Sequence, residues 1–172
     1  IRDGETADIA VKFALTGHLV FSTVHANDAP GTITRLLDIG IAPFLVGSCL
    51  NLVMAQRLVR RICSNCKEEY SPSKEELALV GLDATQVKDP LYRGKGCAEC
   101  RNTGYKGRLA IFEMIPMSRE LRTLVFDTAN EDEIRQAALD NGLVTLREAG
   151  LSRILDGTTS IEEVLRSTVE DL

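Results

Sequence analysis

The first residues of the chain repeat apolar and polar positions with the period of an α-helix. Their apolar positions follow an i, i+3, i+4, i+7, i+8 spacing, at Ala7, Ala10, Val11, Ala14 and Leu15. That spacing places all of them on one helix face. Gly17 follows, and glycine is the usual residue just past a helix C-terminus. The pattern predicts an amphipathic helix over residues 5–16.

The period changes at residues 18–24, which read His-Leu-Val-Phe-Ser-Thr-Val. A short, mostly apolar run rich in β-branched and aromatic residues is typical of a strand buried on both faces, as in a parallel sheet. After it, Asn27 and Asp28 offer capping side chains ahead of Pro30, and a helical stripe ends at Gly40.

Residues 43–61 predict a second, longer helix. The end of this segment is basic, with Arg57, Arg60 and Arg61, and cations suit the negative end of the helix dipole. Helix, buried strand and helix in succession form an α/β unit.

The remainder predicts short helices and one strand. Ser73 and Glu76 match a capping box for a helix that Gly81 closes. Residues 108–113 have the composition of a strand. Further helices are expected from three N-cap residues, two with a glutamate three positions later (Glu133 and Glu163), and from two stops. The caps are Ser118, Asn130 and Ser160, and the stops are Asn141-Gly142 and Asp156-Gly157.

Composition places the chain among ordinary globular proteins. Of its 172 residues, 44% are hydrophobic and 26% charged, and the mean hydropathy is −0.01. No uninterrupted apolar run approaches the roughly 18 residues that a membrane-spanning helix needs, and no charged-then-apolar leader opens the sequence. We expect neither an integral membrane protein nor a secreted precursor.

The net charge of −5 is unevenly distributed. Lys and Arg against Asp and Glu number 6 to 5 in residues 1–62, 7 to 7 in 63–107 and 7 to 13 in 108–172. The acidic last third is most simply explained by the solvated faces of its helices. This balance disfavours a nucleic-acid surface, which needs clustered basic residues.

The strongest chemical signal is a pair of Cys-x-x-Cys motifs. Cys63 and Cys66 are separated from Cys97 and Cys100 by 30 residues. Zinc prefers four thiolates in tetrahedral geometry, and a closed four-thiolate shell makes the metal structural rather than catalytic. Redox-active motifs or free buried thiols are the alternatives. The fifth cysteine, Cys49, is expected to be a small buried apolar residue.

A second group of polar residues brackets the apolar run at residues 18–24. His25 follows its end, where ligands gather in open α/β sheets, with Thr23 and Asn27 beside it. An imidazole there could donate a hydrogen bond to a phosphate oxygen. A satisfied polar residue next to a turn is the alternative. His18 and His25 cannot share one ion, since seven strand residues span about 23 Å.

These motifs together resemble the type II secretion and type IV pilus assembly ATPases. The chain is similar to the end of a Walker B region, then to a histidine box, and then to the tetracysteine insert that pilus retraction ATPases lack. The matching segments are Arg2-Asp3-x-Glu5-Thr6-Ala7, Thr16-Gly17-His18-Leu19-Val20, Ser22-Thr23-x-His25-x-Asn27-x-Ala29, Ala55-Gln56-Arg57-Leu58-Val59-Arg60-Arg61-x-Cys63-x-x-Cys66, Gly96-Cys97-x-x-Cys100-x-x-Thr103-Gly104-Tyr105-x-Gly107-Arg108 and Glu162-Glu163-Val164-Leu165-Arg166-x-Thr168.

The resemblance implies a hexameric, RecA-like motor of α/β fold, cytoplasmic and peripheral at the inner membrane. It would couple hydrolysis of ATP, bound with magnesium, to the assembly of a pilus or pseudopilus, and would contact platform proteins of that membrane. His25 would sense or contact the γ-phosphate, and His18 would support the site or the subunit interface. Thr23 would hold the imidazole, and Arg2 and Arg35 would lie near the nucleotide or between protomers.

The same resemblance divides the chain into three parts. Residues 1–62 would be the C-terminal part of the ATPase core, residues 63–107 a zinc-binding subdomain, and residues 108–172 a strand plus a helical subdomain. We call residues 63–107 the cysteine lobe. Its four cysteines, Cys63, Cys66, Cys97 and Cys100, would be the zinc ligands.

Two ATPase motifs do not occur in these 172 residues. No G-x-x-x-x-G-K-[ST] loop occurs, because Gly94-Lys95 is followed by Gly96. The acidic Walker B residue would fall just before Ile1, so the chain reads as the C-terminal portion of a larger ATPase, inactive alone. The rival interpretation is a free-standing zinc-ribbon interaction module without ATPase activity, since the segment from Gly96 to Gly104 resembles one repeat of the zinc region of chaperone cofactors.

Overall fold

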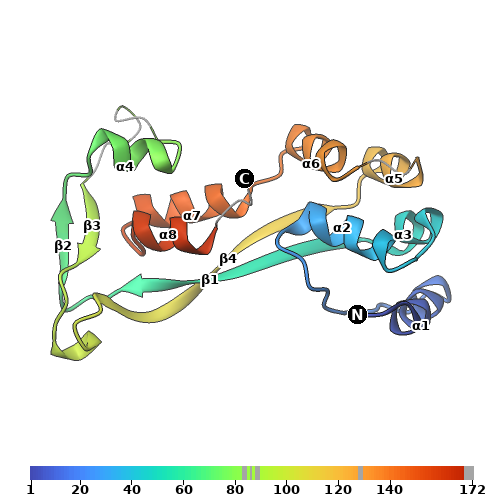
Figure 1. Cartoon of the computed structure of the whole chain (residues 1–172), viewed down its shortest axis with the longest axis horizontal. Coiled ribbons are helices and arrows are strands. Elements are labelled where there is room, and N and C mark those ends of the chain that lie inside the picture. Colours follow the sequence, from blue (N-terminus) through green and yellow to red (C-terminus); the bar gives the residue numbers. More distant parts are fainter. Residues whose placement is uncertain (83–84, 86, 88–89, 128–129, 169–172) are drawn as a thin grey trace. The chain divides into compact units, whose positions relative to one another are not determined.

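The computed structural model describes residues 1–82, 85, 87, 90–127 and 130–168, and Figure 1 shows the order of the elements. The fold mixes α-helices and β-strands, which confirms the predicted α/β class in its broad sense. The chain forms two compact units. The first comprises Ile1–Ala55 and Glu113–Val144, and the second Gln56–Phe112 and Thr145–Leu172. The three-part division of the sequence stays a prediction.

The first unit is mainly helical. Its helices are α1 (Gly4–Leu15), α2 (Ala29–Asp38), α3 (Pro43–Cys49), α5 (Arg119–Phe126) and α6 (Glu131–Asp140). The helix expected at residues 5–16 is therefore confirmed. It is capped by Asp3, whose carboxylate accepts a hydrogen bond from the Thr6 backbone N–H at 2.9 Å and has its pKa lowered by that bond.

The expected caps of the first unit are also confirmed. The Asp28 carboxylate accepts from the backbone N–H of Gly31 at 2.8 Å, which starts α2. Ser118 caps α5. Asn130 and Glu133 form a complete capping box at α6. These interactions join residues three positions apart, so the sequence alone specifies them.

One apolar core holds the first unit together. Ile33 of α2, Val53, Ile115, Val125 of α5 and Ile134 of α6 are almost completely buried in it. A buried carboxylate lies beside this core, because Glu113 accepts a hydrogen bond from the Ala29 backbone N–H at 2.8 Å. That bond satisfies one of the free N–H groups at the start of α2.

The prediction of a buried strand at residues 18–24 was wrong. In the part of the chain that the structure describes, this segment forms no strand. The side chains of Leu19 and Phe21 are 74% and 87% exposed. A strand buried on both faces requires neighbouring strands, and the sheets formed by the described residues include no strand from this segment.

The prediction of one long helix at residues 43–61 was also wrong. Helix α3 ends at Cys49, and Leu52–Ile62 forms strand β1. Strand β4 (Tyr105–Pro116) pairs with β1, and each contributes residues to both units. Strand β4 includes the expected strand at 108–113 but is longer at both ends. Residues 52–62 form a strand because they pair with residues more than 40 positions away. A local sequence pattern contains no information about such a distant partner.

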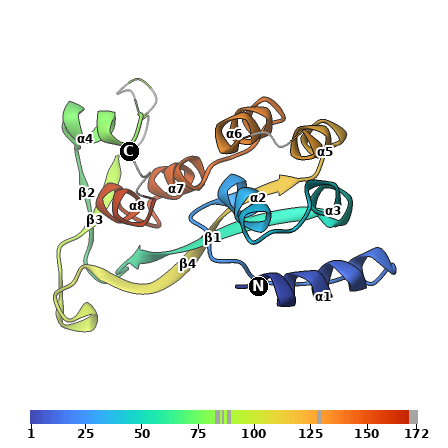
Figure 2. The ribbon, with the colours of Figure 1, turned by 45° about the vertical axis from the view of Figure 1, so that its right-hand side comes forward.

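The second unit contains strands β2 (Lys67–Tyr70) and β3 (Leu91–Gly94), with helices α4 (Lys74–Leu79), α7 (Leu146–Leu155), α8 (Ile161–Ser167) and the 3₁₀ turn η1 (Ala98–Cys100). Figures 1 and 2 show β2 and β3 side by side; they pair antiparallel from Lys67↔Gly94 to Tyr70↔Leu91. The capping box at α4 is confirmed, as are the stops of α6 and α7 at Asn141-Gly142 and Asp156-Gly157.

The core of the second unit joins the cysteine lobe to the last two helices. Its members lie in α4, β3, α7 and α8 or directly after α4, and they are Leu77, Val80, Leu91, Ile154, Ile161 and Val164. Every one of them is at most 5% exposed. The segment between the two cysteine pairs therefore shares its apolar core with α7 and α8. Among the described residues, no helix combines the length and apolar character needed to cross a bilayer.

Candidate functional site

The four paired cysteines converge in the second unit. Their sulfur atoms all lie within 4.8 Å of one another. The Sγ–Sγ distance is 3.9 Å from Cys63 to Cys97, 3.8 Å from Cys66 to Cys100 and 3.7 Å from Cys97 to Cys100. Residues distant in sequence therefore present four soft ligand atoms to one point.

These distances match a tetrahedral metal site better than a redox pair. A tetrahedron with metal–sulfur bonds of about 2.3 Å has sulfur–sulfur edges of about 3.8 Å. A disulfide bond would need about 2.05 Å. All five cysteines are free thiols, so the four sulfurs have the number and spacing that hold a divalent ion.

Tight backbone turns bring the sulfurs together. Cys97 directly precedes η1 and Cys100 is its last residue. The chain then turns through left-handed backbone at Arg101 and Asn102, with φ of 54° and 59°. Gly94 and Gly104 lie backbone against backbone, so a Cβ on either would overlap the carbonyl group of the other. Glycine is needed at both positions because only it permits this approach.

Hydrogen bonds to sulfur prepare the cluster for ionised cysteines. The Cys100 sulfur accepts from the backbone N–H groups of Cys97 at 3.2 Å and Gly104 at 3.3 Å. The Cys66 sulfur accepts from Gly96 N–H at 3.3 Å, and the Cys97 sulfur accepts from the Asn65 side-chain amide at 3.3 Å. Such donors favour thiolate, the form that binds metal.

The pKa values of the thiols follow from these contacts. Burial alone would raise the pKa of Cys100, but the N–H donors from Cys97 and Gly104 lower it to about 6. Donation by Asn65 lowers the pKa of Cys97. Desolvation raises the pKa of Cys66 to about 12. A cation among the sulfurs would reverse that last shift, because a coordinated thiol is deprotonated.

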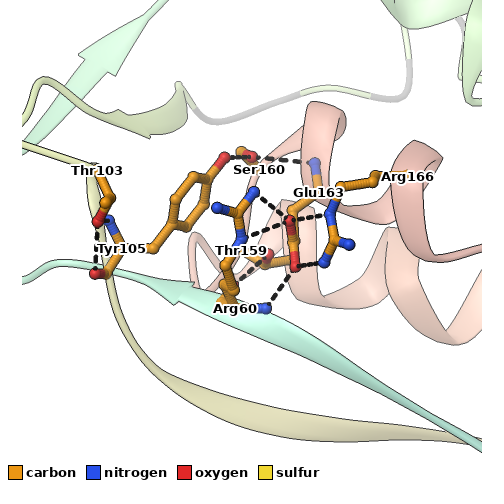
Figure 3. A network of polar contacts seen from close by, with 7 residues as sticks. All are labelled: Arg60, Thr103, Tyr105, Thr159, Ser160, Glu163 and Arg166. Atoms are coloured by element: carbon orange, nitrogen blue, oxygen red, sulfur yellow. Dashed lines mark hydrogen bonds and ion pairs between the residues drawn. The ribbon is translucent and has the colours of Figure 1, made fainter.

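Figure 3 shows a second polar site in the same unit, around the carboxylate of Glu163. Glu163 is fully buried. Its two oxygens accept from the Arg60 backbone N–H at 2.9 Å and Arg60 Nε at 2.8 Å. They also accept from Arg166 Nε at 2.9 Å and Nη2 at 2.6 Å. Burial alone would raise the pKa of Glu163, but the hydrogen bonds from Arg166 and Arg60 lower it to about 2.

Tyr105 connects this carboxylate network to the cysteine lobe. The Arg60 guanidinium lies 4.1 Å from the centre of the Tyr105 ring, and the Tyr105 hydroxyl contacts Ser160 Oγ at 2.6 Å. Thr159 donates its hydroxyl hydrogen to the Arg60 carbonyl at 2.8 Å. The start of α8 is thus bonded to both β1 and β4.

This network was not predicted from the sequence. Ser160 caps α8 as expected, but the Glu163 side chain bonds to Arg60 and Arg166 rather than serving the predicted capping box. Arg60 was expected at the basic end of a helix and lies on β1. The Glu-x-x-Arg spacing of Glu163 and Arg166 was the one local signal available.

The family to which this chain belongs is shown by a comparison with models of known protein families. The model of the family described as type II/IV secretion system protein matches residues 1–166. The chain belongs to the type II/IV secretion system protein family. The resemblance found in the sequence is therefore confirmed at the level of the family.

Relatives within the type II/IV secretion system family are closely similar to this chain. The type IV pilus assembly ATPase PilB of Myxococcus xanthus is 48% identical over 99% of this chain and 31% of its own length. The type II secretion system protein E of Pseudomonas aeruginosa is 46% identical over 99% of the chain and 34% of its own length. The type IV pilus assembly ATPase PilB of Thermus thermophilus is 47% identical over 99% of this chain and 19% of its own length. The chain thus spans about a third or less of the length of these relatives.

In this secretion system family chain, the residues expected near the nucleotide lie on exposed surface. Arg2, Thr23, His25 and Arg35 are all exposed. His18 is exposed as well, and its Nδ1 lies 3.0 Å from the Thr16 hydroxyl oxygen. Their roles stay predictions. Cys49 is only half-buried, less than expected, and burial raises its pKa.

Proposed function

We propose that this chain is the C-terminal portion of a hexameric, RecA-like ATPase that powers type II protein secretion or type IV pilus assembly. The observation that carries the proposal is the match to the family over residues 1–166. Relatives named as pilus assembly ATPases and as a secretion system protein, 46–48% identical over 99% of the chain, support it. Both kinds of relative match equally well, so the proposal covers both machines.

The four clustered cysteines would hold a structural zinc ion in this ATPase. Three of the six sulfur–sulfur distances are 3.7–3.9 Å and all six are within 4.8 Å. These values support the assignment because the edge of a zinc–thiolate tetrahedron is about 3.8 Å. Zinc would supply no catalysis here, since four thiolates leave no open position for water. Its contribution would be to fold the cysteine lobe.

The nucleotide site would be completed by parts of the longer protein. His25 would contact the γ-phosphate, with Thr23 and His18 supporting it and Arg2 and Arg35 contributing positive charge. All five residues are exposed, which supports this proposal because their side chains are accessible to a ligand or to a neighbouring subunit. ATP and magnesium would bind with the phosphate-binding loop that these 172 residues do not contain.

The motor would work in the cytoplasm, peripherally at the inner membrane. Its partners would be other copies of itself in the hexamer and the inner-membrane platform proteins of the machine, and no nucleic acid is expected among them. The charge balance of the cysteine lobe, 7 basic to 7 acidic residues, supports the last expectation.

Replacing His25 tests the proposed role in catalysis. In the longer ATPase that contains this chain, we expect His25→Ala to lower kcat roughly hundredfold while changing nucleotide affinity far less, because a γ-phosphate contact acts mainly in the transition state. Steady-state turnover and equilibrium binding of a fluorescent ATP analogue measure the two quantities. His18→Ala is the matched control and should have the smaller effect on kcat. Equal losses in turnover and in binding would argue for a scaffolding role instead.

The isolated chain tests the need for the rest of the motor. We expect these 172 residues alone neither to bind ATP tightly nor to hydrolyse it, because positioning groups on the phosphates supply most of phosphoryl-transfer catalysis. Phosphate release by the purified chain should equal that of its His25→Ala variant. Turnover clearly above that variant would refute the expectation.

A further inference from the structure

We propose that the metal centre controls the docking of the C-terminal helices α7 and α8, so that the cysteine lobe and these helices form one metal-dependent folding unit. The inference rests on the proposed binding of zinc by the four cysteines. It extends that proposal, because the helices lie 46 or more residues beyond the last ligand in sequence and contain no ligand themselves.

The first step is the position of the ligands at the base of a hairpin. Strand β2 begins at Lys67, directly after Cys66, and β3 ends at Gly94, three residues before Cys97. Lys67 pairs with Gly94, and the Lys95 backbone N–H donates to the Cys66 carbonyl at 3.0 Å. A metal bound by all four sulfurs would therefore close the base of this hairpin.

The second step is the shared apolar core. Leu91 of β3 and Leu77 of α4 are buried against Ile154 of α7 and Val164 of α8. Gly157, just after α7, also lies beneath the side chains of Tyr92 and Lys67, where a Cβ would overlap both. If the hairpin loses its fixed base, the helices lose the surface on which their apolar residues are buried.

The third step is a polar route from sulfur to α8. Gly104 donates its N–H to the Cys100 sulfur, and the next residue, Tyr105, holds Ser160 and the Arg60 guanidinium. Arg60 in turn pairs with the buried carboxylate of Glu163 at 2.7 Å. The position of Tyr105 thus depends on the turn that the metal organises.

Through these contacts, the free energy of metal binding is coupled to the free energy of docking α7 and α8. Metal binding to a site that exists only in the folded state adds to folding stability. Elements that share a core and its hydrogen bonds open together as one cooperative unit. By linkage, a group that stabilises the docked helices must also strengthen metal binding. The coupling can therefore be measured in both directions.

Hydrogen exchange measures the effect of zinc on the helices, by comparing the zinc-loaded chain with the chain stripped of metal by a chelator. We expect amides of α7 and α8 to exchange at least tenfold faster without zinc, together with β2 and β3. Helices α5 and α6, which belong to the other unit, serve as the internal control and should change little. Faster exchange confined to β2 and β3, or equal acceleration in α5 and α6, would overturn the inference.

Zinc affinity measures the second direction. Competition with a chromophoric chelator should give a zinc Kd raised about fivefold or more in Glu163→Gln, whereas Glu162→Gln, an exposed neighbour on the same helix, should leave it unchanged. Unchanged affinity in Glu163→Gln would contradict the coupling while leaving the zinc site intact. A chain that binds no zinc would refute the metal assignment itself, and the inference with it.

Discussion

We expect the purified chain to carry about one zinc ion, and we expect Cys97→Ser to abolish stoichiometric binding and to lower the free energy of unfolding by more than about 4 kcal/mol. Cys97 contacts two other ligand sulfurs, at 3.9 Å to Cys63 and 3.7 Å to Cys100. Serine keeps the size of the side chain but removes the thiolate, so three ligands would remain.

The size of this effect follows from the structure of the lobe. Its local elements are short, with four residues in each of β2 and β3, and a hairpin of that size is at best marginally stable without support. The binding energy of the proposed zinc ion would therefore be a large part of the folding energy of this unit.

Metal analysis by mass spectrometry and chemical denaturation measure the two quantities. Cys49→Ser is the matched control, because Cys49 lies on α3 in the other unit. The control should retain about one zinc per chain. The assignment would be refuted by a Cys97→Ser chain with full zinc content, or by a metal-free chain of unchanged stability.

The second large effect is expected at Glu163. We expect Glu163→Gln to lower the free energy of unfolding by about 3 kcal/mol, because Arg60 and Arg166 would lose the negative charge between them. The amide also cannot accept on both of its atoms, whereas the carboxylate accepts from both arginines on both oxygens. Denaturation at pH 7 measures the change. Glu162→Gln, on the exposed face of the same helix, should stay within about 0.5 kcal/mol of the unmodified chain.

The same carboxylate predicts a pH dependence with a definite sign. The folded-state pKa of Glu163 is lowered from 4.5 to about 2, so the unfolded state binds the proton more readily. The stabilisation is fully present above the unfolded pKa, and it decreases as the pH falls from about 5 towards 2. The stability difference between the unmodified chain and Glu163→Gln should shrink over that range. A difference that stays constant down to pH 3 would contradict the pairing.

Local signals in the sequence were enough for much of the fold. The caps at Ser73, Ser118 and Asn130 are confirmed, since each bond joins residues three positions apart. The expected stop glycines Gly17, Gly81 and Gly142 adopt positive φ, a conformation that an L side chain resists. The Cys-x-x-Cys spacing likewise indicated a four-sulfur cluster, which the sulfur positions now support.

Long-range contacts decided what the sequence could not. Residues 52–62 have apolar positions compatible with a helix, and they form a strand because β4 pairs with them. Residues 18–24 have a strand composition but no strand partner among the described residues. Strand formation depends on such a partner, whereas a helix satisfies its own backbone hydrogen bonds.

In the candidate site, too, some features could be predicted from local sequence and others depend on contacts between distant residues. Its four candidate sulfur ligands could be identified from spacing alone, because each pair lies in one tight turn. The role of Glu163 could not, because its partner Arg60 lies 103 positions away on β1. The sequence by itself determined the helix ends, the turns and the ligand pairs, where the interacting atoms are close along the chain. Only the tertiary structure decided strand pairing, the core shared by the cysteine lobe with α7 and α8, and the buried carboxylate, because these depend on contacts between distant segments.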